Sequence, residues 1–395
     1  MKTIRDFNFK DRKALIRVDF NVPLDSDQKV TDETRINAAI PTIRKILDDG
    51  GSCILMSHLG RPKNGPEYKF SLHHIIPNLR EQLDLTVLFG DDCVGRSAKE
   101  FSRQLNPGQV LLLENVRFYK EETSGDEAFA KQLASYGDIY VNDAFGTAHR
   151  THASTTVIAK FFEDKCYGYV MQAELDNAEK VLNGAEKPLT AIMGGAKISD
   201  KILIIQKLLD IVDNLIIGGG MSYTFTKARG GNIGNSLLEE DKMELTKALE
   251  AKAAKKGVRL FLPVDTVIAD DFSNDANIQT VAVGEIPPQW QGLDIGPETV
   301  RLFSEVLESS KTILWNGPMG VFEFPVFAEG TDAIARAVVK ATENGSFSLI
   351  GGGDSASAIN NLGYGDKVSY ISTGGGALLE YIEGKTLPGV AALEG

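Results

Sequence analysis

The chain has 395 residues, of which 43% are hydrophobic and 24% are charged. This composition excludes a disordered, fibrous or membrane-spanning protein, and the length predicts two domains. Lys and Arg total 42 against 54 Asp and Glu, so the net charge is −12. A nucleic-acid binder needs a basic surface to contact phosphates, so that class is disfavoured, and any anionic ligand must be met by locally concentrated positive charge.

The start of the sequence has no apolar stretch typical of a signal peptide, and no run of about 18 apolar residues occurs later. We therefore expect a cytoplasmic protein that binds neither membrane nor nucleic acid. The three cysteines, Cys53, Cys93 and Cys166, are far apart and odd in number. This pattern fits no disulfide framework, zinc site or redox motif, so we expect packed, reduced thiols.

Four apolar runs in the first half are candidates for buried strands: "ALIRVDFNVP", "SCILMSHLGRP", "VLLLENVRF" and "IYVNDAFGTAHR". Their lack of polar alternation is typical of a parallel sheet covered by helices on both faces. Ligands of such sheets bind beyond the carboxyl ends of the strands, which here carry Arg17, Arg61, Arg117 and Arg150. Because guanidinium groups match carboxylates and phosphates, we expect these arginines to bind a small, multiply charged anion, joined by Arg35 from the next helix.

The histidines near these strand ends have more than one interpretation. His58 lies within "SHLGRP", where its ring either donates to the same anion or caps the strand end by bonding to the backbone. His149 and His152 are three residues apart with Asp143 upstream, a spacing that suits two metal ligands on one helix face. A transition-metal site needs a third firm ligand, and none is evident, so a metal is disfavoured here.

The segment 169–184 predicts a helix between the two halves of the chain. Its sequence, "YVMQAELDNAEKVLNG", is rich in Ala, Glu and Leu, and Asn183 and Gly184 suit a helix end. We therefore predict an α/β protein with two doubly wound, Rossmann-like parallel-sheet domains joined by this helix and a hinge. The first domain covers 1–168 and the second covers 185–378.

Apolar runs that end in glycine recur in the second half: "LTAIMGGAKISDK", "NLIIGGGMSYTF", "TILWNGPMGVFE", "FSLIGGGDSASA" and "VSYISTGGGALLE". The run "RLFLPVDTVIAD" is a further apolar run of this kind, but it does not end in glycine. Glycine lets backbone amides approach a phosphate closely, and the start of the following helix adds partial positive charge. One such loop could be a tight turn only, but several on one sheet predict a nucleotide site.

A dinucleotide-binding fingerprint is half present in this region. Gly351, Gly353 and Ala356 have the G-x-G-x-x-A spacing, but the fingerprint also needs an acidic residue after the next strand, about 20 positions on. Thr373 and Gly374 stand there instead. A nicotinamide-dependent oxidoreductase is therefore disfavoured, and no GxxxxGK[ST] Walker loop occurs in the sequence.

Three charged residues beside the glycine loops have two interpretations each. Asp354 could bind a Mg²⁺ ion that bridges nucleotide phosphates, or cap a helix. Lys197 and Lys201 are four apart in "GGAKISDK", which would place them on one face of a helix. They could contact phosphates or mark an exposed helix start, and the helix dipole favours the first interpretation because it opposes lysines there.

A series of motifs resembles the phosphoglycerate kinase family in order and spacing: "RVDFNVP", "SHLGRP", "VNDAFGTAHR", "GGAKISDKI", "GLDIGPET", "WNGPMGVFE", "GGGDSASA" and "STGGGA". The resemblance runs from about residue 13 to the end. Thr151, Ile198 and Ser199 depart from the usual motifs, and none has an assigned role. The resemblance implies phosphoryl transfer from 1,3-bisphosphoglycerate to ADP, giving 3-phosphoglycerate and ATP, with Mg²⁺ as cofactor.

The resemblance also implies roles for individual residues. Phosphoglycerate would be held by Asp19, Asn21, Arg35, His58, Arg61, Arg117 and Arg150. The nucleotide site would be lined by Gly195, Gly219, Leu293, Asn316, Pro318, Glu323, Gly352, Gly353 and Ser355. Within it Glu323 would bind the ribose, Lys201 the phosphates and Asp354 the metal. The phosphoryl group in transfer would be stabilised by Arg35, Lys197 and the amides of Gly374 and Gly375.

The implied chemistry needs no general base, because nucleophile and leaving group are already anions, so catalysis reduces to positioning and neutralising charge. Because the arginine-rich and glycine-rich sites fall on different domains, we hypothesise that the domains close around both substrates.

The family implies a monomer in which 379–395 return to the first domain. The non-enzyme alternative is a hinged, two-domain anion-binding module, disfavoured by the missing signal peptide.

Overall fold

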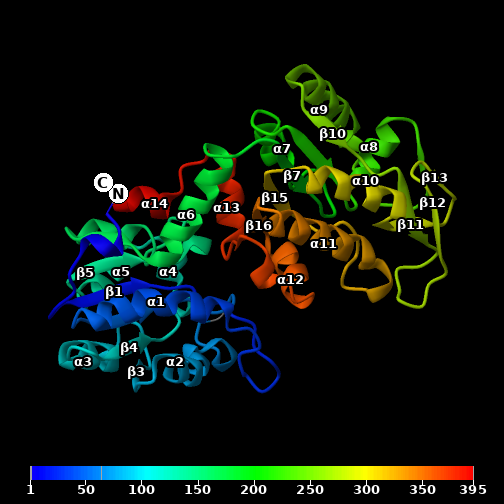
Figure 1. Cartoon of the computed structure of the whole chain (residues 1–395). Helices are drawn as coiled ribbons and strands as arrows, with labels where there is room; N and C mark the ends of the chain where they lie inside the picture. Colours follow the sequence, from blue (N-terminus) through cyan, green and yellow to red (C-terminus); the bar gives the residue numbers. More distant parts are fainter. Residues whose placement is uncertain (1, 64, 395) are drawn as a thin grey trace. The chain divides into compact units, whose positions relative to one another are not determined.

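The computed structural model describes residues 2–63 and 65–394 and divides the chain into two compact units (Figure 1). One unit is Met1–Asp176 with Lys385–Gly395, and the other is Asn177–Gly384. Each unit contains a six-stranded sheet in which every strand pair is parallel. The predicted fold class is therefore confirmed. Among the described residues, no helix is both long and apolar enough to cross a membrane.

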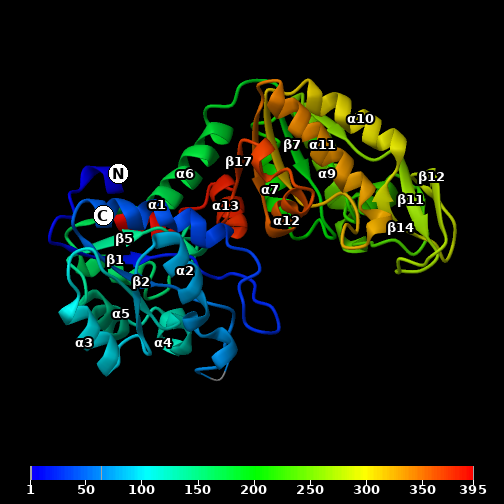
Figure 2. The same ribbon diagram turned by 60° about the horizontal axis from the view of Figure 1, so that its bottom comes forward.

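The first unit has the strand order β3-β4-β2-β1-β5-β6. The strands are β1 (Lys13–Arg17), β2 (Ser52–Met56), β3 (Val87–Gly90), β4 (Val110–Leu113), β5 (Ile139–Asn142) and β6 (Lys165–Tyr167). The helices are α1 (Thr34–Asp48), α2 (Ile76–Leu83), α3 (Arg96–Gln104), α4 (Lys120–Ser124), α5 (Glu127–Ala134) and α14 (Pro388–Glu394). Helices cover both sides of the sheet (Figure 2).

Burial on both faces explains why the strands of this unit read as continuous apolar runs. Ile16 of β1 packs in the same core as Ile43 of α1, whereas its neighbour Leu15 points to the opposite face and is equally buried. A strand between two layers of helices has no solvent-facing position for polar residues. The three cysteines are buried and unpaired, as predicted.

The second unit has the strand order β10-β8-β7-β15-β16-β17. The strands are β7 (Leu189–Met193), β8 (Asn214–Ile217), β10 (Arg259–Phe261), β15 (Thr312–Asn316), β16 (Phe347–Gly351) and β17 (Tyr370–Ile371). The helices are α7 (Ile202–Leu208), α8 (Ser222–Ala228), α9 (Met243–Lys256), α10 (Pro297–Glu308), α11 (Glu329–Glu343), α12 (Gly353–Asn361) and α13 (Gly375–Ile382). Trp315 of β15 lies in the core with Phe303 of α10 and Val338 of α11.

The second unit also contains an antiparallel sheet that the sequence analysis did not anticipate. It has the order β12-β11-β14 and consists of β11 (Asp265–Ala269), β12 (Ile278–Ala282) and β14 (Gln291–Ile295). A short parallel pair, β9 (Asn232–Ile233) with β13 (Glu285–Ile286), lies in the same unit. The run "RLFLPVDTVIAD" is therefore two strands, β10 and β11, which belong to different sheets on either side of Pro263.

Helix α6 (Tyr169–Leu182) forms where 169–184 predicts a helix, and it stops just before Asn183 and Gly184. Its start is held by the first unit. The carboxylate of Asp143, after β5, accepts hydrogen bonds from the amides of Val170 and Met171 at 2.8 and 3.2 Å. The unit boundary falls inside this helix, between Asp176 and Asn177.

The C-terminal segment packs in the first unit from Lys385 onward. The amide of Gly389 donates to the carbonyl of Ala148 at 2.8 Å, and the hydroxyl of Tyr167 donates to the carbonyl of Val390 at 3.1 Å. Gly389 approaches so closely that a Cβ there would lie 2.9 Å from Cα of Ala148. Helix α14 is thus fixed beside the loop that follows β5.

Candidate functional site

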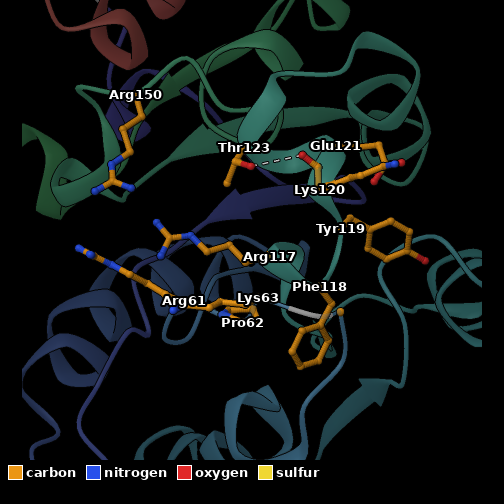
Figure 3. Close-up of a pocket in the computed structure, with 11 residues that line it drawn as sticks. Arg61, Pro62, Lys63, Arg117, Phe118, Tyr119, Lys120, Glu121, Thr123 and Arg150 are labelled. Carbon is orange, nitrogen blue, oxygen red and sulfur yellow. Dashed lines mark hydrogen bonds between the residues drawn. The ribbon is translucent and has the colours of Figure 1, made fainter.

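The carboxyl ends of β4, β2, β1 and β5, which are neighbours in the first sheet, bring three arginines together. Arg61 follows β2, Arg117 lies in the short turn after β4, and Arg150 follows β5. All three line a cavity of about 790 Å³, and their guanidinium groups point toward the same space (Figure 3). The structure therefore places these side chains at one site, as their positions after neighbouring strands predict.

Arg17 does not join them, contrary to the expectation that it would reach the same ligand. It is fully buried, and its guanidinium donates to Oγ of Ser154 at 2.8 Å, to the carbonyl of Val18 and toward Nδ1 of His58 at 3.2 Å. Since Arg17 is the last residue of β1, its side chain enters the packed interior below the cavity instead of leaving the strand end.

The cavity is strongly electropositive. Arg117 donates from Nη1 to the carbonyl of Gly60 at 2.8 Å, which fixes its orientation. Burial, and then the charges of Arg17 and Arg150, lower the pKa of Arg117 to about 10. The group stays charged at neutral pH, so several cations face one space, and a bound anion would relieve their mutual repulsion.

Arg35, Asp19 and Asn21 lie next to this cavity without lining it. Arg35 is the second residue of α1, and its Nη1 donates to the carbonyl of Asn21 at 2.8 Å and lies 3.5 Å from the carboxylate of Asp19. Oδ1 of Asn21 accepts from the amide of Gly60 at 2.8 Å. These bonds tie the loop after β1 to the loop after β2.

His58 is almost fully buried among the arginines. Burial, followed by the charges of Arg17, Arg117, Arg35 and Arg150, holds its pKa well below the usual value, so the ring is neutral. Its ring nitrogen Nδ1 bonds to Arg17 and not to a backbone group, so the strand-capping interpretation is wrong.

His149 and His152 are engaged with neighbouring side chains. Nε2 of His149 accepts from Nε of Arg150 at 3.1 Å, and Nδ1 of His152 lies 3.8 Å from the buried carboxylate of Glu122. Burial and nearby arginines lower the pKa of His152 to about 4. Asp143, the third group considered for a metal, caps α6, and within 2–63 and 65–394 no cluster of His, Cys, Asp and Glu is arranged to hold a metal ion.

Sequence reasoning missed one side of the arginine-lined cavity. Its remaining described lining is formed by Pro62, Lys63, Gly65, Phe118, Tyr119, Lys120, Glu121 and Thr123. The hydroxyl of Tyr119 donates to Asp92 at 2.6 Å and so holds this wall in place. Lys63 and Lys120, two and three residues after Arg61 and Arg117, were a usable signal, because residues close to a strand end in a short loop can face the same space.

The second unit has its own cavity, of about 440 Å³, at the carboxyl ends of its central strands. Six of the predicted nucleotide residues line it: Gly195, Gly219, Leu293, Pro318, Glu323 and Asp354. Tyr223, Leu237, Phe272, Met319 and Val321, which the sequence analysis did not single out, add an apolar wall. The cavity is therefore apolar on one side and lined by glycine backbone on the other.

Glycine is required where the loops after β7 and β15 meet. A Cβ on Gly194 would lie 2.1 Å from the carbonyl oxygen of Pro318, and one on Gly317 would lie 2.2 Å from that of Gly194. Gly317 also has a φ of +98°, which favours glycine. The two loops therefore pack backbone against backbone.

Lys197 and Lys201 do not share a helix face, so that part of the prediction is wrong. Residues 198–201 form a bend and a turn, and α7 begins only at Ile202. Lys201 is half-buried and its Nζ donates to Oδ1 of Asn316, while Lys197 is exposed. Burial lowers the pKa of Lys201, and the charges of Asp354 and Asp200 oppose this.

Two helices begin side by side at the ends of β16 and β17. Gly352 is the N-cap of α12, with a φ of +92°, and a Cβ on Gly375 at the start of α13 would lie 2.8 Å from Cα of Gly352. Asp354 is the second residue of α12 and exposed, so the interpretation of it as the cap is wrong. Gly353 starts α12, next to the exposed carboxylate of Asp354.

The remaining predicted residues make internal hydrogen bonds. Ser355 is fully buried, and its Oγ accepts from the amide of Gly317 at 2.6 Å. The amide of Gly374 donates to Oγ of Ser372 at 3.2 Å. Nδ2 of the buried Asn316 has no partner among the described residues, which leaves a donor available beside Lys201.

Comparison with known proteins agrees with these features. A family model described as "Phosphoglycerate kinase" matches residues 4–385. A protein named phosphoglycerate kinase from Porphyromonas gingivalis is 55% identical, with all of both chains covered. A cytosolic phosphoglycerate kinase from Triticum aestivum is 52% identical, covering 99% of this chain and 98% of its own.

A solved structure of phosphoglycerate kinase from Coxiella burnetii superposes with a TM-score of 0.89 at 39% identity, covering 100% of this chain and 98% of its own. Sequence and structure agree over the full length of the chain. The chain therefore belongs to the phosphoglycerate kinase family.

Proposed function

We propose that the chain catalyses the reversible transfer of the acyl phosphate of 1,3-bisphosphoglycerate to MgADP, giving 3-phosphoglycerate and ATP in glycolysis and gluconeogenesis. One observation carries the proposal: two cavities of complementary chemistry lie at the carboxyl ends of two parallel sheets, one lined by arginines and the other by glycine backbone and apolar side chains. A small polyanion matches the first, and a nucleotide matches the second.

The first unit binds phosphoglycerate through Arg61, Arg117 and Arg150, with contributions from Asp19, Asn21, Arg35 and His58. Guanidinium forks bind both a carboxylate and a phosphate bidentately, and 3-phosphoglycerate carries one of each. The charge that these arginines concentrate in a chain of net charge −12 supports this assignment.

The second unit binds the nucleotide with its base against the apolar wall of Leu293 and Val321 and its ribose near Glu323. Phosphates bind at the starts of α12 and α13, where the amides of the first helical turn and the helix dipoles favour anions. Lys201 and Asn316, which already bond to each other, supply further donors.

The residues present suit Mg²⁺. This ion is held by one or two carboxylates together with nucleotide phosphates. Asp354 lines the cavity, is exposed, and lies close enough to Lys201 for its charge to raise the lysine pKa. Asp354 would hold the ion, and the ion would supply charge neutralisation between the phosphates.

In the transfer step, Arg35, Lys197 and the amides of Gly374 and Gly375 neutralise charge on the moving phosphoryl group. No proton has to move, so no general base is needed. Because donor and acceptor bind on different units, the two sites must meet during transfer, and we propose closure of the units around both substrates. A fall in the radius of gyration in X-ray scattering with both substrates, absent with either alone, is expected.

The assignment is tested by binding and turnover together. Titration calorimetry should give one site for 3-phosphoglycerate and a separate site for ADP, and mixing 3-phosphoglycerate with MgATP should release ADP. Binding of ADP without any turnover of 3-phosphoglycerate would contradict the assignment. We further propose a cytoplasmic monomer, for which light scattering should give the mass of a single chain at micromolar concentration.

A further inference from the structure

Four buried polar side chains form a continuous chain behind the arginine-lined cavity: Glu122, Ser154, Arg17 and His58. Each is less than a tenth exposed, and the first three are fully buried. None of the four is among the described residues that line the cavity. Glu122, Ser154 and Arg17 have no exposed surface, whereas His58 is 4% exposed, so His58 is the member of the chain that can reach a ligand. Buried polar groups in such numbers are costly unless every one is paired, which makes their arrangement informative.

Every polar atom of Ser154 takes part in a hydrogen bond. Its amide and its hydroxyl donate to the two oxygens of Glu122 at 2.9 and 2.7 Å, and its hydroxyl accepts from Nε of Arg17 at 2.8 Å. Its carbonyl accepts from the hydroxyl of Tyr140 at 2.9 Å. The hydroxyl proton therefore points toward Glu122, and its lone pair faces Arg17.

Arg17 is oriented in turn. Its Nε donates to Ser154 and its Nη1 donates to the carbonyl of Val18, and these two hydrogen bonds fix the plane of the guanidinium group. Nη2 is then the nitrogen that faces His58, at 3.2 Å from Nδ1. A guanidinium has donors only, so Nδ1 of His58 must be the acceptor. In a neutral imidazole the proton then sits on Nε2.

The electrostatics of the chain are consistent with a neutral ring. Burial, and then the positive charges of Arg17, Arg117, Arg35 and Arg150, lower the pKa of His58 and so disfavour a second proton. The negative charge buried with Arg17 is that of Glu122, one hydroxyl away. No described residue forms a hydrogen bond with Nε2 of His58. This nitrogen is also absent from the fully buried polar atoms that lack a hydrogen-bond partner, so it keeps some access to solvent.

We propose that Glu122, Ser154 and Arg17 are positioning residues that fix the proton of His58 on Nε2, so that the neutral ring donates a hydrogen bond to an oxygen of bound 3-phosphoglycerate. This rests on the proposed binding of that substrate in the first unit. A neutral donor at this point keeps substrate recognition independent of pH across the range in which an ordinary histidine titrates.

The direct test is ¹⁵N NMR of the imidazole nitrogens in the unmodified protein. We expect one protonated nitrogen, Nε2, and one unprotonated nitrogen, Nδ1, for His58, unchanged between about pH 5.5 and 8. A proton on Nδ1, or a titration within this interval, would overturn the proposal. This measurement stands whether or not any variant folds.

The second test is Ser154→Ala, compared with Ser102→Ala. Ser102 is a buried serine of α3 whose hydroxyl, among the described residues, bonds only to the carbonyl of Lys99. We expect Ser154→Ala to raise KM for 3-phosphoglycerate by about tenfold, the scale of one lost hydrogen bond to a charged partner, with KM for MgATP unchanged. Ser102→Ala should leave both constants unchanged.

A double-mutant cycle separates positioning from general damage. If Ser154 acts through His58, then Ser154→Ala should change KM by less than about twofold in a His58→Ala background. Equal effects in both backgrounds would refute the positioning role. Absence of 3-phosphoglycerate turnover in the unmodified protein would contradict the proposed function. Normal turnover in the unmodified protein, with an unchanged KM in Ser154→Ala, would contradict the positioning role alone.

Discussion

The carboxylate of Asp294 accepts a hydrogen bond from the amide of Gly330 at 2.7 Å, although the two are 36 residues apart in sequence. Gly320 and Gly330 approach it so closely that a Cβ on either would lie 2.3 or 2.2 Å from its Oδ1. Asp294 therefore ties the end of β14 to the segment 317–330, which supplies part of the lining of the nucleotide cavity.

This contact predicts a pH dependence of stability. Burial raises the pKa of Asp294 to about 7, against about 4 in an unfolded chain, although the amides of Gly330 and Ile295 oppose the shift. Between these values the folded state holds a proton that the unfolded state has lost, so the contribution of Asp294 to stability falls as pH rises from about 4 to 7.

The corresponding variant is Asp294→Asn, which cannot ionise. The difference in free energy of unfolding between the unmodified protein and this variant should shrink by about 2 kcal/mol between pH 5 and pH 7.5, measured by urea denaturation. The exposed Asp366→Asn serves as the control. A difference that grows with pH would mean that the fold stabilises the ionised form.

Arg117→Ala should raise KM for 3-phosphoglycerate by about 10- to 100-fold, since a charge-assisted hydrogen bond is worth about 1.5 to 3 kcal/mol. The dissociation constant of MgADP, measured by calorimetry, should not change, because the nucleotide cavity is lined by the second unit. Arg96→Ala, whose side chain is 90% exposed on α3, controls for loss of a positive charge. An unchanged KM would remove Arg117 from the substrate site.

Asp354→Asn should raise the Mg²⁺ concentration needed for half-maximal turnover by about tenfold, because one carboxylate ligand of the ion is lost. Binding of ADP in EDTA should stay the same or tighten slightly, since a negative charge near the phosphates is removed. A magnesium titration of ADP release measures the first effect. Equal magnesium dependence of variant and unmodified protein would assign the ion to other ligands.

Lys197→Ala should lower kcat by about a hundredfold or more, by analogy with cationic groups at other phosphoryl-transfer sites. Its exposed side chain is held by no hydrogen bond among the described residues, so the fold and the affinity for MgADP should change little. Lys255→Ala, an exposed lysine of α9, is the matched control. Near-normal turnover of the Lys197 variant would exclude the catalytic role.

Much of the fold follows from local sequence. A run such as 110–113, apolar at every position, is compatible with a strand buried on both faces, and Arg117, four residues after it, lies beyond the carboxyl edge of the sheet. The glycine loops are equally local, because Gly317 needs a positive φ wherever the chain goes next. These signals suffice to locate both cavities.

Some of the errors depend on distant contacts and others on the local backbone. Arg17 turns inward because Ser154, 137 residues later, accepts from it. Lys197 and Lys201 have helical spacing, but the backbone between them turns before α7 begins. Phe272 lies in the antiparallel-sheet region, and its exposed side chain reaches the nucleotide cavity only through that sheet. No pattern in a single sequence indicates contacts between residues so far apart in the chain.

The most direct test of the central claim is to incubate the protein with 3-phosphoglycerate, MgATP and hydroxylamine, which traps an acyl phosphate as a hydroxamate. ADP and hydroxamate should appear in equal amounts, and both should vanish without magnesium or with Arg117→Ala at low 3-phosphoglycerate. ADP formed without hydroxamate, or no ADP although both ligands bind, would contradict the assignment of this chain as an acyl-phosphate kinase.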